Sequence, residues 1–214
     1  MPRTGRPREF DRDQAVTAAM LLFWERGFEP ASLAQLRAVM GGISPASFYA
    51  AFESKEALFR EAVQQYISTY GQVSESFRDT SLTSKAAIEQ GLRRSARMQT
   101  ENSHPLGCLL VLSAVNCSPE QQQIRDLLAK EREKVRGWIK DCIERAVANG
   151  ELPDSADVDM RVTLFETFLR GISIQAQDGV PYEKIDAAIT RLMSTWDLMI
   201  AQEVQDPMTK APYL

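Results

Sequence analysis

The sequence has little of the chemistry on which most enzymes and metal sites depend. It contains one histidine, His104, and three cysteines, Cys108, Cys117 and Cys142, none of them in a CxxC pair. A single histidine excludes most histidine-based zinc sites and makes a Ser-His-Asp or Cys-His group hard to build. Phosphate-binding loops, dinucleotide-binding glycine fingerprints and HExxH motifs are also missing. We therefore expect no enzyme activity, no cofactor and no bound metal.

Long apolar runs and secretion signals are missing too. No run approaches the roughly 18 residues of a membrane-spanning helix, and the longest one near the start covers residues 18–24. The N-terminus is polar and lacks the apolar core of a signal peptide. The scattered cysteines do not suggest a disulfide framework. These absences predict a cytoplasmic protein with reduced thiols and no membrane partner.

Neither sign of charge dominates strongly, but the acidic and basic residues are unevenly distributed along the chain. The net charge is −4; residues 1–60 hold 8 Lys/Arg and 7 Asp/Glu, and the remainder carries the acidic excess. Arg3, Arg6 and Arg8 precede the first acidic residue. This N-terminal arm can lie along DNA phosphates or in the minor groove. A disordered solubilising tail is the alternative.

Residues 32–52 have the pattern of two short helices joined by a glycine turn. Apolar residues recur at helical spacing through residues 33–40. The two glycines at 41–42 can take the positive φ that ends one helix and redirects the chain. Ser44 can cap the next helix, and Pro45 suits its first position. The pattern indicates a helix-turn-helix, although an ordinary helical hairpin in an all-α core would look similar.

The second of these helices has one apolar face and one small, polar face. Phe48 and Phe52 lie four residues apart and face the core. Small side chains permit close approach to the major groove, where methyl and hydroxyl groups contact base edges. The exposed face consists of Ala46, Ser47, Tyr49 and Ala50.

Helices flank this unit on both sides. A helix begins at the cap residue Asp11 and ends at Gly27. A further helix begins after Ser54 and carries apolar residues for more than twenty positions. Lys55, in its first turn beside free backbone N–H groups, is placed to hold a phosphate. A solvated lysine is the alternative.

Five short motifs, in order and at characteristic spacing, carry a family resemblance. They are Phe23…Gly27-Phe28, Ser32-Leu33-Ala34-Gln35-Leu36, Gly42-Ile43-Ser44, Phe48-Tyr49-Ala50-Ala51-Phe52 and Ser54-Lys55-Glu56-Ala57-Leu58. Residues 11–66 thereby resemble the N-terminal domain of TetR/AcrR-family transcriptional regulators. The resemblance implies DNA binding by a repressor. The candidate DNA-binding residues are Ser32, Ser44, Pro45, Ala46, Ser47, Tyr49, Ala50 and Lys55, with Arg6 and Arg8 from the arm.

Two departures from the family pattern affect the reading helix. The turn is one glycine longer than usual, and Pro45-Ala46 stand where a basic residue and glycine are frequent. Either change can re-aim the helix. The resemblance therefore implies DNA binding more firmly than it implies any operator sequence.

Residues 80–214 have helical patterns throughout, so the predicted fold class is all-α. Apolar residues at intervals of four and three in the last two helices form a coiled-coil-like seam. We interpret the seam as a four-helix homodimer interface, which the resemblance also implies; burial within a monomer is the alternative. The interface residues are Val162, Phe165, Leu169, Ile172, Ile185, Ile189, Leu192, Trp196 and Met199.

The expected organisation is a DNA-binding head followed by a helical body. The segments are a basic arm at 1–10, the helix-turn-helix domain at 11–53, a linking helix at 54–78, a ligand-binding and dimerisation domain at 79–205 and a tail at 206–214. The resemblance implies that the body holds a small-molecule effector whose binding releases a near-palindromic operator. The candidate pocket residues are Met98, His104, Leu110, Ser113, Asn116, Trp138, Phe165, Phe168 and Gln175.

Two alternatives to a ligand-responsive dimeric repressor remain open at this point. One is a regulator of the same fold that responds to an oxidant, an electrophile or a soft metal through Cys108, Cys117 or Cys142. The other is a helical adaptor that has lost DNA binding, which the scarcity of basic side chains on the reading helix keeps possible. The sequence identifies neither the effector nor the target genes.

Overall fold

The computed structural model describes residues 11–115 and 117–205, with the side chains of residue 115 and of residues 197–205 left aside. Arg6, Arg8, Asn116 and the tail lie outside the described residues, as does the side chain of Met199. Within the described ranges every regular element is a helix, which confirms the all-α fold. None of these helices combines the length and apolar composition needed to cross a membrane.

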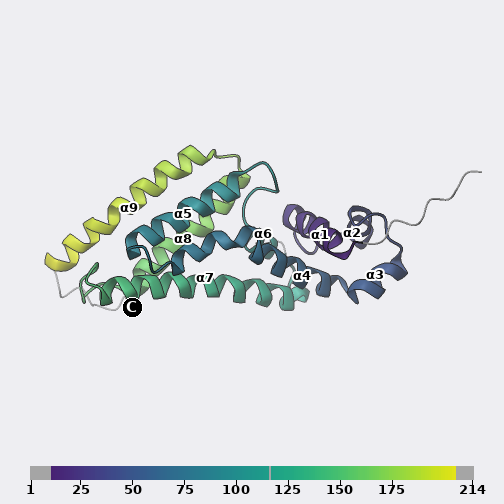
Figure 1. The fold of residues 1–214 in the computed structure, drawn as a ribbon, viewed down its shortest axis with the longest axis horizontal. Helices are drawn as coiled ribbons and strands as arrows, with labels where there is room; N and C mark the ends of the chain where they lie inside the picture. The colour runs from purple at the N-terminus through teal and green to yellow at the C-terminus, as the bar shows by residue number, and fades with distance from the viewer. Residues whose placement is uncertain (1–10, 116, 206–214) are drawn as a thin grey trace, which may run out of the picture.

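The head contains three helices at one end of the molecule (Figure 1). They are α1 (Arg12–Arg26), α2 (Leu33–Val39) and α3 (Pro45–Phe52). The Asp11 carboxylate accepts a hydrogen bond from the Gln14 backbone N–H at 3.0 Å, which caps α1. Gly27 ends α1 with a φ of 85°, as the sequence indicates. α4 (Lys55–Ser68) then runs from the head into the body.

The expected linking helix through residue 78 is shorter than predicted. α4 ends at Ser68, and residues Tyr70–Arg78 continue as a 3₁₀ helix, η1. The hydroxyls of Ser68 and Thr69 both donate to the Gln65 carbonyl, at 3.0 and 2.7 Å. These side chains compete with the backbone for the acceptor that an α-helix needs. Apolar periodicity alone cannot separate an α-helix from this tighter continuation.

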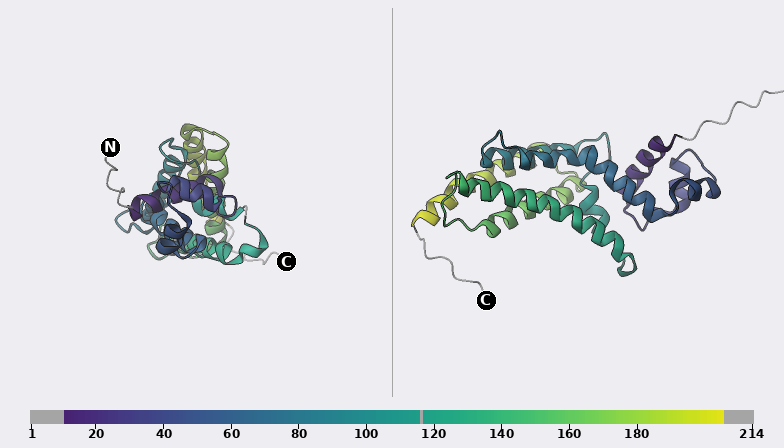
Figure 2. Two further views of the ribbon diagram at one scale, coloured as in Figure 1. Left: turned by 90° about the vertical axis from the view of Figure 1, so that its right-hand side faces the viewer. Right: turned by 60° about the horizontal axis from the view of Figure 1, so that its bottom comes forward.

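The remaining helices form the body, which extends along the long axis of the molecule (Figure 2). They are α5 (Ser84–Thr100), α6 (Leu109–Val115), the short 3₁₀ helix η2 (Pro119–Gln121), α7 (Gln122–Ala148), α8 (Val158–Gln177) and α9 (Tyr182–Gln205). α7 runs along one side, and α9 lies on the far side from the head (Figure 1).

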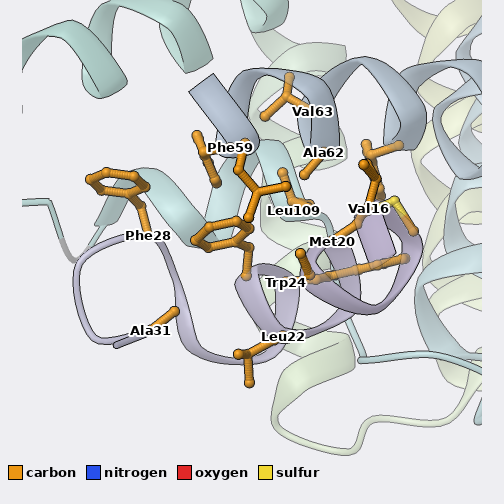
Figure 3. Packing of buried hydrophobic residues seen from close by; sticks show 14 of the residues in the cluster. Val16, Met20, Leu22, Trp24, Phe28, Ala31, Phe59, Ala62, Val63 and Leu109 are labelled. Carbon is orange, nitrogen blue, oxygen red and sulfur yellow. The ribbon is translucent and has the colours of Figure 1, made fainter. Parts of the chain in front are cut away.

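One continuous hydrophobic cluster joins the head to the body. Its head portion includes Phe23 of α1, whose ring meets Phe59 of α4 edge to face with centroids 4.9 Å apart. Figure 3 shows Trp24, Phe59 and Leu109 in this packing, contributed by α1, α4 and α6. The same cluster continues to Met98 and other residues of the body. The head is therefore supported by the body's own core.

A stack of aromatic rings strengthens this junction. His104 lies over Trp24 of α1 with centroids 4.6 Å apart and an interplanar angle of 18°, and meets the ring of Tyr70 at the same separation. Trp24 also meets Tyr66 of α4 edge to face at 4.8 Å. These contacts hold the end of α1 between α4 and the loop before α6.

Much of the predicted dimer seam also packs against helices of the same chain. Phe165 and Trp196 pack with ring centroids 6.0 Å apart, in the second hydrophobic cluster of the molecule. Leu169 and Leu192 are partly buried against it. Six of the nine predicted interface residues are at most 4% exposed and pack within this chain: Val162, Phe165, Ile172, Ile185, Ile189 and Trp196.

Candidate functional site: a DNA-reading surface and an internal cavity

The first helix of the two-helix unit is fixed at its start by a capping box. The Ser32 hydroxyl accepts from the Gln35 backbone N–H at 3.2 Å, and the Gln35 side chain accepts from the Ser32 backbone N–H at 2.9 Å. The two reciprocal bonds satisfy backbone donors that the helix leaves open. Ser32 is exposed, but its hydroxyl already serves the helix.

The turn uses both glycines. Gly41 and Gly42 have φ values of 90° and 74°, a conformation that residues with a Cβ rarely adopt. The Arg37 guanidinium reaches across the turn and donates to the Ile43 carbonyl at 2.8 Å. The longer turn is thus a fixed structure that sets the direction of α3.

α3 is anchored by one face and exposed on the other. Ser44 caps it by accepting from the Ser47 backbone N–H at 3.0 Å, and Phe48 and Phe52 are buried in the head. The Tyr49 side chain is 51% exposed. The predicted face of Ala46, Ser47, Tyr49 and Ala50 is exposed, and so is Pro45. Apart from Tyr49, these side chains are short and leave the backbone of α3 accessible from outside.

Lys55 is only partly available to a phosphate. Its ammonium donates to the Glu29 carbonyl at 3.2 Å and lies 4.5 Å from the centre of the Phe28 ring. Partial burial lowers the pKa of Lys55. An ammonium has three N–H donors, so two remain for a ligand beside the start of α4.

The body contains a cavity of about 280 Å³, at the lower end of the size range of small-molecule sites. Its wall is formed by α4, η1, α5, α6, α7 and α8. Tyr66 and Ile67, in the last turn of α4, belong to this wall. Because α4 begins directly after α3, one helix links the cavity to the reading helix, a span of roughly 16 Å from Lys55 to Tyr66.

Three of the nine predicted pocket residues line this cavity: Met98, Leu110 and Trp138. Asn116 lies outside the described residues, and the other five have different positions. His104 is held in the aromatic stack, and the Ser113 hydroxyl donates to the Phe23 carbonyl at 3.3 Å. Phe165 and Phe168 pack in or against the second core cluster, and Gln175 is exposed.

Charged and polar residues of the cavity escaped the sequence analysis. Glu131 and Arg132 of α7 and Glu166 and Arg170 of α8 all belong to its wall. A signal was present, because Glu131 stands three residues after Leu128 and four before Val135, on the apolar face of its helix. A charged residue on such a face marks a place where the core is incomplete or polar.

The three cysteines are free thiols in buried or partly buried positions. Burial raises the pKa of Cys108, Cys117 and Cys142, which reduces the thiolate fraction. Cys108 lines the cavity, and its sulfur accepts a hydrogen bond from the Tyr66 hydroxyl at 3.3 Å. Among the described residues no cluster of His, Cys, Asp or Glu has the geometry to hold a metal ion.

Comparison with known proteins agrees with this geometry. Residues 15–62 match the family described as "Bacterial regulatory proteins, tetR family", and residues 85–189 match "Tetracyclin repressor-like, C-terminal domain". The chain is 31% identical to the HTH-type transcriptional repressor BdcR of Escherichia coli, over 86% of this chain and 87% of the relative. The chain belongs to the TetR family. TetR-family proteins are transcriptional regulators and not enzymes, as the sequence indicates.

Two further relatives span most of this TetR-family chain. The HTH-type transcriptional repressor ComR of Escherichia coli is 29% identical, over 92% of this chain and 93% of the relative. A cysteine mutant of the TetR family transcriptional regulator CifR, complexed with 26-bp double-strand operator DNA, is 39% identical. Its match covers 89% of this chain and 100% of that chain, with a TM-score of 0.83.

Proposed function

We propose that the protein is a dimeric transcriptional repressor that binds operator DNA through α3 and leaves it when a small molecule occupies the cavity. The observation that carries this proposal is the path of α4, which starts at the reading helix and ends in the cavity wall. Two relatives are named repressors, and CifR is described bound to operator DNA. Such a protein acts in the cytoplasm, where bacterial DNA is accessible to it.

DNA reading is assigned to the exposed face of α3. Its small side chains permit the helix to sit deep in the major groove, and the Tyr49 hydroxyl adds a donor and acceptor for a base edge or a phosphate. Lys55 supplies charge at the start of α4, with two N–H donors available. The basic arm with Arg6 and Arg8 is proposed to add phosphate contacts.

A second apolar face on α8 is the proposed dimer surface. Met160 and Ile174 are 41% and 43% exposed, and partly buried Leu164 and Phe168 lie on the same side of the helix. Gly171, on this side, would give an added Cβ no contact within 4 Å. An isologous pairing of this face with its copy would cover the apolar stripe and replace the predicted seam.

Release follows from the distance between two heads. A dimer reads consecutive major grooves about 34 Å apart. A ligand that displaces Tyr66 or Ile67 tilts α4 and with it α3, so the two reading helices no longer fit both grooves. The ligand shifts the dimer toward a state with low DNA affinity, to the extent that it binds that state more tightly.

The proposal is tested by selecting bound sequences from a random duplex pool with purified protein at a stated salt concentration. We expect a near-palindromic site whose affinity falls as salt rises. Enrichment of no sequence by folded, dimeric protein would support the adaptor alternative instead. A single unrepeated half-site would argue against a dimeric reader.

The dimer surface has a separate test by sedimentation. Ile174→Glu places a charge in the proposed interface and should shift the protein toward monomer. Gln123→Glu, on the exposed side of α7, adds the same charge elsewhere and should leave the dimer unchanged. A monomeric wild-type protein, or an unchanged Ile174→Glu dimer, would remove this face from the proposal.

A further inference from the structure

The carboxylates around the cavity already have cationic partners. Glu131 pairs with Lys134 at 2.8 Å. Glu166 accepts from the Arg136 guanidinium at 2.5 Å and from Arg170. Glu75, on the η1 side of the cavity, pairs with Arg78 at 3.0 Å. A cationic ligand would therefore have to displace an existing ion pair to reach any of these acids.

Arg132 stands apart from these pairs. Its guanidinium is half-buried in the cavity wall and donates to the Leu110 carbonyl at 2.6 Å. In the described part of the chain no carboxylate lies within ion-pair distance of it. Burial and the neighbouring Arg170 lower the pKa of Arg132. A guanidinium has five N–H donors in one plane, and most of these remain for another acceptor.

A chain of buried polar side chains lies on another side of the cavity. The Ser173 hydroxyl donates to the Gln99 side-chain oxygen at 2.7 Å, and the Gln99 amide donates to the Ser95 hydroxyl oxygen at 2.7 Å. All three residues are buried and belong to the wall. Because the Ser95 hydroxyl oxygen accepts from Gln99, the Ser95 O–H can donate to an acceptor in the cavity. Both polar features of the cavity thus offer donors.

The rest of the wall is largely apolar. It includes Ile67, Val73, Met98, Leu110 and Trp138. Such a surface gains free energy by burying an apolar body. The cavity volume of about 280 Å³ limits the ligand to a small molecule.

From these observations we propose that the effector is a small apolar molecule with a single anionic head, of the carboxylate class, held by Arg132. Planar guanidinium and carboxylate groups match in a two-bond geometry. This inference rests on the proposed function, because it takes the cavity as the effector site. The head group would pair with Arg132, which has no carboxylate within ion-pair distance among the residues that the structure describes.

The test compares three probes of nearly equal shape on the wild-type dimer by calorimetry. They are phenylbutyrate, the neutral phenylbutyramide and the cationic phenylbutylamine. We expect phenylbutyrate to bind more tightly than either by about tenfold or more, the range of a charge-assisted hydrogen bond. Equal binding of the amide, tighter binding of the amine, or no binding of phenylbutyrate at millimolar concentration would overturn the inference.

Variants then locate the head group. Arg132→Gln should remove the preference for phenylbutyrate over phenylbutyramide, and Arg132→Lys should retain part of it. Arg125→Gln, on the exposed side of the same helix, is the matched control and should bind as the wild type does. A preference that survives in folded Arg132→Gln would also overturn the inference. The three-probe comparison needs no variant and decides the matter if Arg132→Gln does not fold.

A mobility-shift assay separates this inference from the proposed function. If phenylbutyramide binds as well as phenylbutyrate and releases DNA, the cavity is an effector site without anion preference, and only the inference fails. If phenylbutyrate binds with the expected preference and DNA stays bound, the inference stands and the release mechanism fails.

Discussion

The Tyr66 hydroxyl donates a hydrogen bond to the sulfur of Cys108, with the two atoms 3.3 Å apart. Tyr66 lies on the helix that leads from the reading helix, and Cys108 lies just before α6. Both residues line the cavity. The hydrogen bond thus connects α4, the helix that follows the reading helix, to the segment before α6 on the cavity wall.

The thiols are expected to be dispensable for effector response. Burial raises the pKa of Cys108, so little thiolate forms near neutral pH and reaction with electrophiles is slow. A variant with Cys108→Ser, Cys117→Ser and Cys142→Ser should bind operator and release it as the wild type does. The measurement is a mobility-shift titration of the operator complex with phenylbutyrate, the probe of the proposed effector class. Loss of response, with DNA binding retained, would favour the cysteine-switched alternative.

Tyr49 is expected to contribute to DNA affinity and little to stability. Its side chain is 51% exposed, and an exposed residue changes the free energy of unfolding by about 0.5 kcal/mol or less. Tyr49→Ala should weaken operator binding by about tenfold, which is the lower part of the range for one base contact. Fluorescence anisotropy with labelled operator measures the change.

The matched control for this variant is Gln123→Ala, which truncates an exposed side chain on α7. It should bind operator with unchanged affinity. If Tyr49→Ala and Gln123→Ala bind equally well, Tyr49 does not face the DNA and α3 is oriented differently in the groove.

Two glycines in helices should respond in opposite ways to alanine. A Cβ on Gly91 of α5 would stand 2.3 Å from an edge atom of the buried Phe77 ring. Overpacking of this kind costs more than the gain in helix propensity, so Gly91→Ala should destabilise the fold by about 1–2 kcal/mol. Gly137 of α7 has open space around it, and Gly137→Ala should stabilise by about 0.5–1 kcal/mol. Urea unfolding of both variants provides the comparison, and a gain in stability for Gly91→Ala would show that Phe77 can move.

Asp186 is expected to make stability depend on pH in the acid range. Arg93 of α5 pairs with it and holds its pKa below the ordinary value of 3.8, with help from the Tyr182 hydroxyl at 2.9 Å. A lowered folded-state pKa stabilises the protein above 3.8, and this contribution is lost as the pH falls through the lower value. Asp186→Asn should reduce stability at neutral pH and flatten its loss in acid. Thermal melts across the acid range test this, with exposed Asp141→Asn as control; parallel curves for Asp186→Asn and the wild type would contradict it.

The head was predictable because its signals are local. The caps Ser32 and Ser44, the glycines of the turn and the apolar pair Phe48 and Phe52 each act within a few residues of chain. Short-range rules therefore locate the two helices and their exposed face. The hydroxyls of Ser32 and Ser44 already accept capping hydrogen bonds. The sequence could not show this, because serine is a favoured residue both for a helix cap and for a DNA contact.

The helices of the body were predictable from the sequence, but the helices against which each of them packs were not. Residues such as Val162 and Ile189 have the spacing of a seam whether their neighbours come from the same chain or from another. Only the packing of α5 and α7 against α8, and of α5 against α9, decides that they are buried within this chain. The cavity depends likewise on contacts between distant segments. Glu131 interrupts the apolar face of its own helix, but only the packing of α7 against α8 places it in one cavity wall with Glu166.

One hydrophobic cluster runs unbroken from Phe23 to Met98, so a structural change at either end can reach the other. Thermodynamic linkage makes any such coupling reciprocal. If an effector lowers the affinity for operator by some factor, bound operator must lower the affinity for effector by the same factor. The concentration of effector needed to release the protein from an operator then depends on how tightly the protein binds that operator. Promoters with strong operators would respond later than those with weak ones, so a single cavity could order the expression of several genes.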